Sequence, residues 1–152
     1  MSANPILIRD ATPADAPTIA EFNVRMAMET EHLKLDPPTV LAGVRAVLSD
    51  PSRGRYFVAD INGTLAGQLL ITHEWSDWRN GDLWWIMSVY THPNHRRKGL
   101  FRQLYQYVRQ RAIESNARGL RLYVEHENTT GQSTYHSLGM QKTHYRIMEE
   151  MF

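Results

Sequence analysis

A thirty-residue stretch near the middle of the chain, Trp84 to Ile113, restricts the possible folds more than any other part of the sequence. Residues 84–91 are mostly aromatic, β-branched or otherwise apolar, which is typical of a strand buried within a sheet. Pro93 ends this strand, because proline cannot donate to a strand ladder. Apolar residues then recur at every fourth position, which predicts an amphipathic helix: they are Leu100, Leu104, Val108 and Ala112. The stretch therefore predicts a strand, a turn and a helix.

The turn between this strand and this helix is strongly basic. It runs from Asn94 to Gly99 and contains three consecutive cations, Arg96, Arg97 and Lys98. The first N–H groups of a helix have no partner within the helix, and the helix dipole adds partial positive charge at the same end. We therefore expect this corner to hold an anion, most naturally a phosphate. The alternative is a solvated basic turn.

The whole chain has the size and composition of one globular domain, which we expect to span residues 1–152. With 42% hydrophobic and 22% charged residues, it is long enough to bury a sizeable core. No stretch approaches the roughly 20 apolar residues of a membrane span, and the first residues lack a signal pattern, so we expect a cytoplasmic protein that does not contact a membrane. Because the chain has no cysteine, disulfides, zinc-thiolate sites and a cysteine nucleophile are excluded.

The remaining elements follow from periodicity and turn residues. We expect a strand at residues 6–9, helices at 12–31 and 36–50, strands at 56–59 and 65–72, a loop or hairpin tip at 73–82, a strand at 120–125, a helix at 129–138 and a terminal strand or strand pair at 140–152. Asn62-Gly63 is the strongest hairpin signal. The strand–helix–strand unit from Trp84 to Glu125 implies that its two strands run parallel. The chain is therefore predicted to be an α/β domain.

Two motifs carry a resemblance to a known family. Arg96 to Leu100, directly after the strand, resembles the acetyl-coenzyme A loop of the GNAT acetyltransferases, whose usual pattern is Gln/Arg-x-x-Gly-x-Gly/Ala. The chain departs from that pattern at Phe101, where the family has a small residue. Asn128, followed by Tyr135 and then by Gly139-Met140, is similar to a second family motif of Asn, Tyr and Gly-Phe.

The order of elements also matches the GNAT fold, so the resemblance covers nearly the whole chain. It implies an α/β fold with a mixed, mostly antiparallel central sheet, which contains a parallel central strand pair and is flanked by helices. It further implies an enzyme that transfers an acetyl group from acetyl-coenzyme A to a primary amine of a small molecule, by direct attack in a ternary complex.

The same resemblance assigns residues to the cofactor. The bulged central strand leaves the Val89 N–H for the thioester oxygen, and Tyr135 gives a proton to the leaving thiolate. The implied cofactor-binding residues are Val89, Tyr90, Thr91, Arg96, Arg97, Lys98, Gly99, Leu100, Phe101, Arg102, Asn128 and Tyr135. No metal is implied. A tyrosine on a short amphipathic helix could instead be a half-buried core residue, but the spacing from Asn128 favours the functional role.

The general base and the acceptor site are less defined by the sequence. Family members often carry a glutamate on the central strand, whereas residues 84–88 contain none. Glu29, Glu31 and Glu74 are therefore the candidates, directly or through water, with His73 as a weaker one. The expected substrate-binding residues are Glu29, Glu31, Glu74, Trp75, Trp78 and Trp85. Acids near indole rings favour a small cationic or amphiphilic amine, although Trp75 and Trp78 could instead fold back onto the core.

Other functions remain open at this stage. The chain could bind acyl-coenzyme A without turnover, or acetylate proteins. A nucleic-acid-binding module would use the basic residues 96–111 against phosphates, with the loop tryptophans stacking on bases, but we do not expect a nucleic-acid partner. We expect a homodimer, because residues 144–152 form a long terminal stretch that ends on apolar residues and could pair through a strand edge. Glu149 and Glu150 argue the other way, since charges on an edge commonly prevent such pairing.

Overall fold

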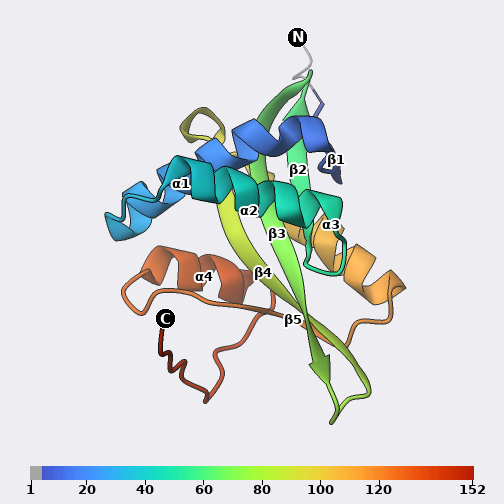
Figure 1. Ribbon diagram of the computed structural model, residues 1–152. Helices are drawn as coiled ribbons and strands as arrows, with labels where there is room; N and C mark the ends of the chain where they lie inside the picture. The colour runs from blue at the N-terminus through green and yellow to red at the C-terminus, as the bar shows by residue number, and fades with distance from the viewer. Residues whose placement is uncertain (1–4) are drawn as a thin grey trace.

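The computed structural model of the chain describes residues 5–152, and its centre is a five-stranded sheet with strand order β1-β2-β3-β4-β5 (Figure 1). The strands are β1 (Leu7–Asp10), β2 (Arg55–Ile61), β3 (Thr64–Ser76), β4 (Gly81–Thr91) and β5 (Gly119–Leu122). The first four pair antiparallel, and β4 pairs parallel with β5. The predicted fold, a mixed and mostly antiparallel sheet with one parallel pair, is confirmed.

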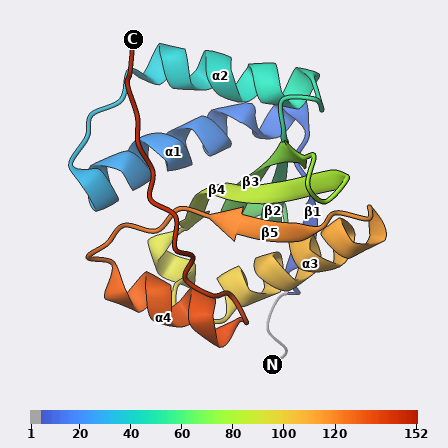
Figure 2. The same cartoon turned by 90° about the horizontal axis from the view of Figure 1, so that it is seen from below.

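Helices cover both faces of this sheet. They are α1 (Ala16–Glu31), α2 (Pro37–Ser49), α3 (Leu100–Glu114) and α4 (Thr129–Ser137), with short 3-10 turns at Pro13–Asp15 and Pro93–His95. Figure 2 shows α1 and α2 on one side of the sheet and α3 with α4 on the other. None of the helices in the described part of the chain is both long and apolar enough to cross a membrane.

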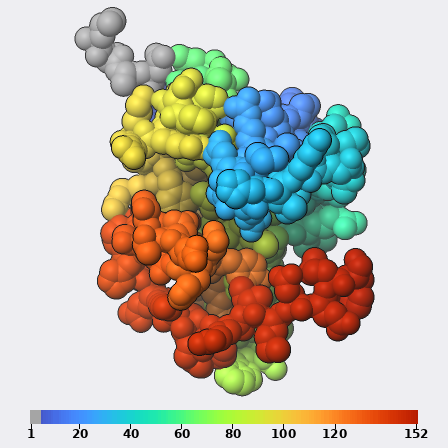
Figure 3. Space-filling model, turned by 90° about the vertical axis from the view of Figure 1, so that its left-hand side faces the viewer, coloured from blue at the N-terminus to red at the C-terminus, as the bar shows by residue number. Residues whose placement is uncertain are grey.

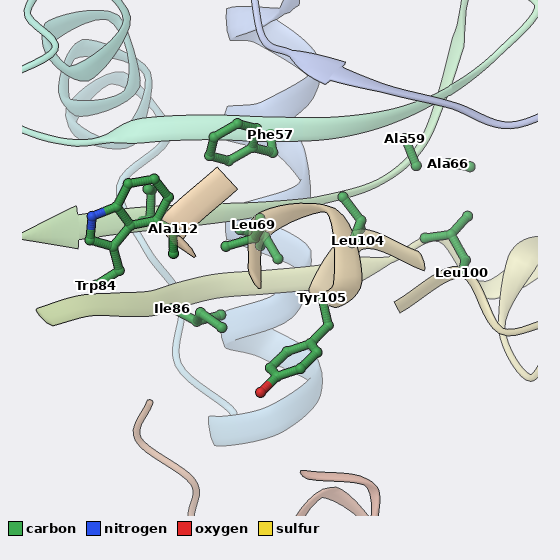
Figure 4. Packing of buried hydrophobic residues seen from close by; sticks show 12 residues of the cluster. Phe57, Ala59, Ala66, Leu69, Trp84, Ile86, Leu100, Leu104, Tyr105 and Ala112 are labelled. Carbon is green, nitrogen blue, oxygen red and sulfur yellow. The ribbon is translucent and has the colours of Figure 1, made fainter. Parts of the chain in front are cut away.

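Each face of the sheet has its own apolar cluster. Phe57, Leu69, Trp84 and Ile86 meet Leu104 and its neighbours from α3 (Figure 4). On the opposite face, α1 and α2 pack against the sheet through a cluster that includes Ile19, Phe22, Val44, Tyr56, Val58 and Tyr90. Burying one such large side chain contributes about 1.5–3 kcal/mol. The two clusters hold β4 from both faces of the sheet, through Trp84 and Ile86 on one face and Tyr90 on the other.

Gly67 allows α3 to start close to the sheet. A Cβ atom there would lie 2.6 Å from Leu100 Cδ2 and 3.0 Å from the Tyr90 carbonyl oxygen, so a larger residue would push the start of α3 outward. The sequence gives no local sign of this close approach, because it depends on the packing of distant segments.

The hairpins agree with the turn signals, although one is longer than predicted. Asn62 and Gly63 have φ of 52° and 85° and join β2 to β3, as the Asn-Gly pair predicts. The expected loop at residues 73–82 is mostly strand: the ladder between β3 and β4 continues to Ser76 and Gly81. The longer hairpin carries Trp75 and Trp78 to its far end.

The predicted terminal strand or strand pair at residues 140–152 is wrong: no strand follows α4 in the described chain. Residues 144–152, which we call the C-terminal arm, are exposed, and Met148 and Met151 expose 94% and 81% of their surface. The arm reaches out from the body of the molecule (Figure 3). A strand needs a ladder partner, and β5, which ends at Leu122 rather than at the predicted Glu125, pairs in the described structure only with β4.

Candidate functional site

A β-bulge interrupts β4 just before the basic turn. Gln68 pairs with Tyr90 and Leu70 pairs with Met87, so Ser88 and Val89 share a single opposite residue on β3. Ser88 has a φ of 51°, which is uncommon for a residue other than glycine. On the other edge of β4, the pairing with β5 reaches only from Leu83 to Ile86. The bulge therefore lies in a part of β4 that β5 does not cover.

The turn after the bulge presents unpaired backbone donors. Arg97 and Gly99 have φ of 62° and 76°, and α3 then begins at Leu100. The Gln103 N–H donates to the Gly99 carbonyl oxygen at 3.1 Å, but within residues 5–152 the N–H groups of residues 97–102 have no hydrogen-bond acceptor. Such a set of donors at the positive end of a helix dipole suits an anion.

The cations of this turn have different surroundings. The Arg96 guanidinium donates to the Thr91 carbonyl oxygen at 2.8 Å and to the Glu29 carboxylate at 2.7 Å, and it lies 5.4 Å from the centre of the Tyr90 ring. Lys98 Nζ donates to the Asn94 carbonyl oxygen at 3.1 Å. Arg96 therefore links the turn to β4 through Thr91 and to α1 through Glu29.

The two acids predicted on α1 are not equivalent. Glu29 accepts hydrogen bonds from the Tyr90 hydroxyl at 3.3 Å and from Arg96, so both of its carboxylate oxygens are engaged near the end of β4. Glu31 is exposed at the end of α1, and among the described residues no side-chain hydrogen bond or ion pair joins it to the other predicted site residues. The structure brings Glu29, Tyr90, Thr91 and Arg96 together and leaves Glu31 apart.

The second motif forms the start and the inner side of α4. Asn128 is the N-cap of this helix, since its Oδ1 accepts from the Gly131 N–H at 2.9 Å. The Tyr135 ring lies 5.7 Å from the Phe101 ring, edge to face. Burial raises the pKa of Tyr135. Phe101, the residue that departs from the family pattern, thus connects the start of α3 to α4.

Four of the six predicted substrate-binding residues line one groove of about 1750 Å³ together with Tyr135, whereas Glu29 and Glu31 are not part of its wall. Glu74, Trp75, Trp78, Trp85 and Tyr135 are all part of its wall. Trp75 and Trp78 expose 62% and 86% of their surface, so the alternative that they fold back onto the core is wrong. A smaller hollow of about 510 Å³ between α1 and the β2–β3 turn contains none of the predicted residues.

Sequence reasoning missed two residues in the wall of this groove. Arg121 donates to the Glu74 carboxylate at 3.1 Å, and Glu74 also accepts from Trp85 Nε1 at 3.0 Å. The Tyr123 ring lies 4.7 Å from that of Trp85. Both residues alternate with the apolar Leu120 and Leu122 in the sequence, and this alternation was the signal that could have placed Arg121 on the open face of β5 and Tyr123 on the same side just after it.

His73 does not belong to this groove. Its ring packs edge to face on Trp84 at 5.6 Å, and its Nδ1 lies 3.9 Å from Asp82. Trp84 belongs to the cluster under α3, whereas Glu74 and Trp85 face the groove. Among residues 5–152, no group of three or more histidine or acidic side chains is arranged to hold a metal ion.

Comparisons with known proteins agree with this geometry. A profile described as the Acetyltransferase (GNAT) family matches residues 21–140. No protein of curated function matches the chain. A solved structure described as a possible acetyltransferase from Clostridium difficile 630 has a TM-score of 0.91 and 42% identity, over 97% of each chain.

Two more distant structures share the fold. A predicted acetyltransferase from Clostridium acetobutylicum, solved with acetyl-CoA, has a TM-score of 0.80 and 17% identity over 96% of each chain. The aminoglycoside N-acetyltransferase AAC(6')-Iy, solved with CoA, has a TM-score of 0.79 and 19% identity over 99% of this chain and 97% of that one. Since the family profile covers most of the sequence and a relative of 42% identity covers nearly all of it, the chain belongs to the acetyltransferase (GNAT) family.

Proposed function

We propose that this protein transfers an acetyl group from acetyl-coenzyme A to the primary amine of a small molecule, by direct attack in a ternary complex. The observation that carries the proposal is the arrangement at the end of β4. A bulge at Ser88–Val89 leads directly into a turn whose N–H groups at residues 97–102 have no acceptor in the described structure. Acetyl-coenzyme A carries a thioester and a diphosphate in one molecule. Acetyl transfer from it therefore needs the oxyanion donor at the bulge and the diphosphate-binding turn close together.

The turn fits the diphosphate of coenzyme A. The free N–H groups supply hydrogen bonds, while Arg97, Lys98 and Arg102 add positive charge around the start of α3. Arg96 keeps the turn against β4 through Thr91 and Glu29 and is therefore proposed to position it. When bound, the coenzyme supplies the acetyl group as an activated thioester.

Three groups of the chain would then contact the pantetheine arm and its thioester. The Val89 N–H is proposed to donate to the thioester oxygen as negative charge develops there. Asn128 caps α4 through Oδ1, which leaves its Nδ2 to hydrogen-bond the pantetheine arm. Tyr135 is proposed to donate its hydroxyl proton to the leaving sulfur, since burial raises its pKa and keeps it protonated at neutral pH.

The charges in the groove wall limit the chemical class of the acceptor amine. Its wall contains two carboxylates, Glu74 and Asp77, and six cationic side chains: Arg79, Arg109, Arg118, Arg121, Lys142 and Arg146. A polycation would be repelled by this wall. We therefore favour an amine that also carries an aromatic part, for Trp75 and Trp78, and an anionic group, for the arginines.

Glu74 is proposed as the acid that faces this amine. Its carboxylate is held by Trp85 and Arg121, so it would take the proton of the amine through a water molecule rather than directly. Glu74 is part of the groove wall, whereas Glu29 and Glu31 are not. This position favours Glu74 over the two acids of α1.

We further propose that the protein forms a homodimer through its C-terminal arm. The arm carries exposed apolar side chains, Ile147, Met148, Met151 and Phe152, and is not paired with any strand of its own chain in the described structure. The unpaired edge of β5 and an unpaired arm on a second copy are complementary, and a two-fold axis closes such an exchange.

A thiol-release assay with a matched amine panel tests the activity and the acceptor class. The panel comprises phenethylamine, phenylalanine, spermine and a short peptide with a free N-terminus, each with acetyl-coenzyme A. We expect release with the aromatic amines, and a higher kcat/KM for the one that carries a carboxylate. Cofactor binding without turnover of any amine would mean a binding protein, and turnover of the peptide alone would mean a protein acetyltransferase.

A further inference from the structure

A buried polar cluster lies directly behind the bulge of β4. Gln68 on β3 is fully buried, and its Nε2 donates to Asn23 Oδ1 of α1 at 2.8 Å and to the Ser88 carbonyl oxygen at 3.3 Å. Asn23 Nδ2 lies 3.2 Å from the hydroxyl of Tyr56 on β2 and donates to it. Side chains from β2, β3 and α1 therefore form one hydrogen-bonded cluster, and Gln68 connects it to the peptide unit that joins Ser88 to Val89.

The hydrogen bond from Gln68 sets the direction of that peptide unit. The C=O and N–H of a trans peptide point in opposite directions, and no cis peptide occurs in the described residues. When the Ser88 carbonyl is held toward Gln68, the Val89 N–H must therefore point away from the cluster. Donation to the carbonyl also polarises the peptide, which makes its N–H a stronger donor.

Two observations indicate that this glutamine serves the peptide unit rather than the stability of the core. Ser88 has a φ of 51°, a conformation that side chains other than glycine seldom adopt without support from their surroundings. Gln68 Oε1 is the one buried side-chain oxygen or nitrogen without a partner in the described part of the chain. Leaving a buried acceptor unpaired costs about 1–3 kcal/mol, so an apolar side chain would avoid a penalty that the glutamine incurs.

We propose that Gln68 is a positioning residue, which orients the Ser88–Val89 peptide so that the Val89 N–H faces the thioester oxygen. The proposal rests on the function proposed above for Val89 and adds the group that fixes its direction. Asn23 and Tyr56 hold the Gln68 amide in turn. The substrate itself is contacted by Val89 and not by Gln68.

The Gln68→Met variant tests this role, because methionine has a similar volume and cannot hydrogen-bond the Ser88 carbonyl. Acetyl-coenzyme A presents a thioester oxygen to Val89, whereas coenzyme A does not. We therefore expect calorimetry to show an affinity for acetyl-coenzyme A about tenfold weaker, with the affinity for coenzyme A unchanged. We also expect kcat to fall by about a hundredfold, as for loss of an oxyanion donor, at an unchanged KM for the amine.

Thr72→Val is the matched control. Thr72 is on the same strand, and its hydroxyl also reaches across to β4, where it contacts Met87 Sδ at 3.4 Å. Its loss should change neither kcat nor the ratio of the two affinities. A fall in kcat of similar size in both variants would assign Gln68 to general packing and overturn the proposal.

A second variant, Gln68→Glu, adds a readout that a purely structural role does not produce. A buried carboxyl has a raised pKa, and only its protonated form can donate to the Ser88 carbonyl. The other titratable group that the described structure places on this cluster is the Tyr56 hydroxyl, which stays protonated below pH 10 because burial raises its pKa more than hydrogen bonds with Asn23 and Ser88 lower it. The ratio of kcat in this variant to wild-type kcat should therefore rise as the pH falls from 8 to 6.

The outcomes distinguish a failure of the proposed function from a failure of the proposed role of Gln68. Wild-type protein that binds neither acetyl-coenzyme A nor coenzyme A would overturn the proposed function and this inference with it. Wild-type binding and turnover, together with unchanged kcat and affinities in a folded Gln68→Met variant, would overturn the role of Gln68 alone. A flat activity ratio for Gln68→Glu between pH 6 and 8 would do the same.

Discussion

At the scale of single residues, Tyr135 and Phe101 show how a departure from a motif is accommodated. Phe101 stands where the family pattern has a small residue, and its ring packs edge to face on Tyr135 at 5.7 Å. The aromatic contact orients the tyrosine and helps to bury it, which raises its pKa. The substitution therefore supports the residue that we propose as the proton donor.

Removing the Tyr135 hydroxyl should affect turnover and not binding. For Tyr135→Phe we expect kcat to fall about a hundredfold or more, the usual range for a general acid, with acetyl-coenzyme A affinity nearly unchanged. Tyr107→Phe is the control, because Tyr107 lies on α3, its hydroxyl accepts from Arg111 at 2.8 Å, and it is not part of the groove wall. Steady-state kinetics of the wild type and both variants test this prediction. A kcat of Tyr135→Phe equal to that of the wild type would mean that water, not Tyr135, is the acid.

The pH dependence of kcat follows from the same residue. Free tyrosine ionises near pH 10, and burial raises the pKa of Tyr135 above that value. The protonated form that donates the proton therefore persists through pH 10, while the fraction of neutral amine increases with pH. A kcat profile measured from pH 7 to 10 should rise and then level off. A decline before pH 9 that disappears in Tyr135→Phe would contradict a raised pKa.

At the scale of elements, α4 depends on a residue that we also assign to the cofactor. Asn128 caps α4, and Asp36 caps α2 in the same way by accepting from the Thr39 N–H at 3.2 Å. Replacing either cap by alanine should lower the free energy of unfolding by about 1 kcal/mol. Only Asn128→Ala should also weaken acetyl-coenzyme A binding. Denaturant unfolding and calorimetry on both variants test this prediction. Equal affinities for acetyl-coenzyme A in the two variants would mean that Asn128 acts only as a helix cap.

The sequence predicted the elements whose signals are local and missed those that depend on distant partners. Asn62-Gly63 and the apolar period of α3 gave correct elements because turn residues and periodicity act within a few positions. The C-terminal arm was predicted to be a strand, but a strand also needs an edge to pair with. Gln68 and Arg121 were missed for the same reason, since their importance comes from Ser88 and Glu74, both far away in the sequence.

At the scale of the whole molecule, the proposed role of the C-terminal arm in forming a homodimer can be tested by measuring the mass in solution. We expect a dimer of about twice the 17.6 kDa chain mass by light scattering at micromolar concentration. Deleting residues 147–152 removes the exposed apolar side chains and should give a monomer or an insoluble chain. Glu149→Lys with Glu150→Lys is a milder variant that keeps the arm. A dimer that persists after the deletion would place the interface on another surface.

The central claim is that the turn after β4 binds acetyl-coenzyme A through its backbone donors, and calorimetry on three proteins tests it most directly. Gly99 has a φ of 76°, and a Cβ atom there would meet nothing within 4 Å, so Gly99→Ala adds backbone strain without a clash or a charge. Gly99→Asp adds no more backbone strain than alanine does, since aspartate tolerates the left-handed region better, and it places a negative charge beside the diphosphate. We predict measurable acetyl-coenzyme A binding by the wild type, a loss of a few fold for Gly99→Ala and about a hundredfold or more for Gly99→Asp. An unchanged affinity in a folded Gly99→Asp variant would contradict the claim.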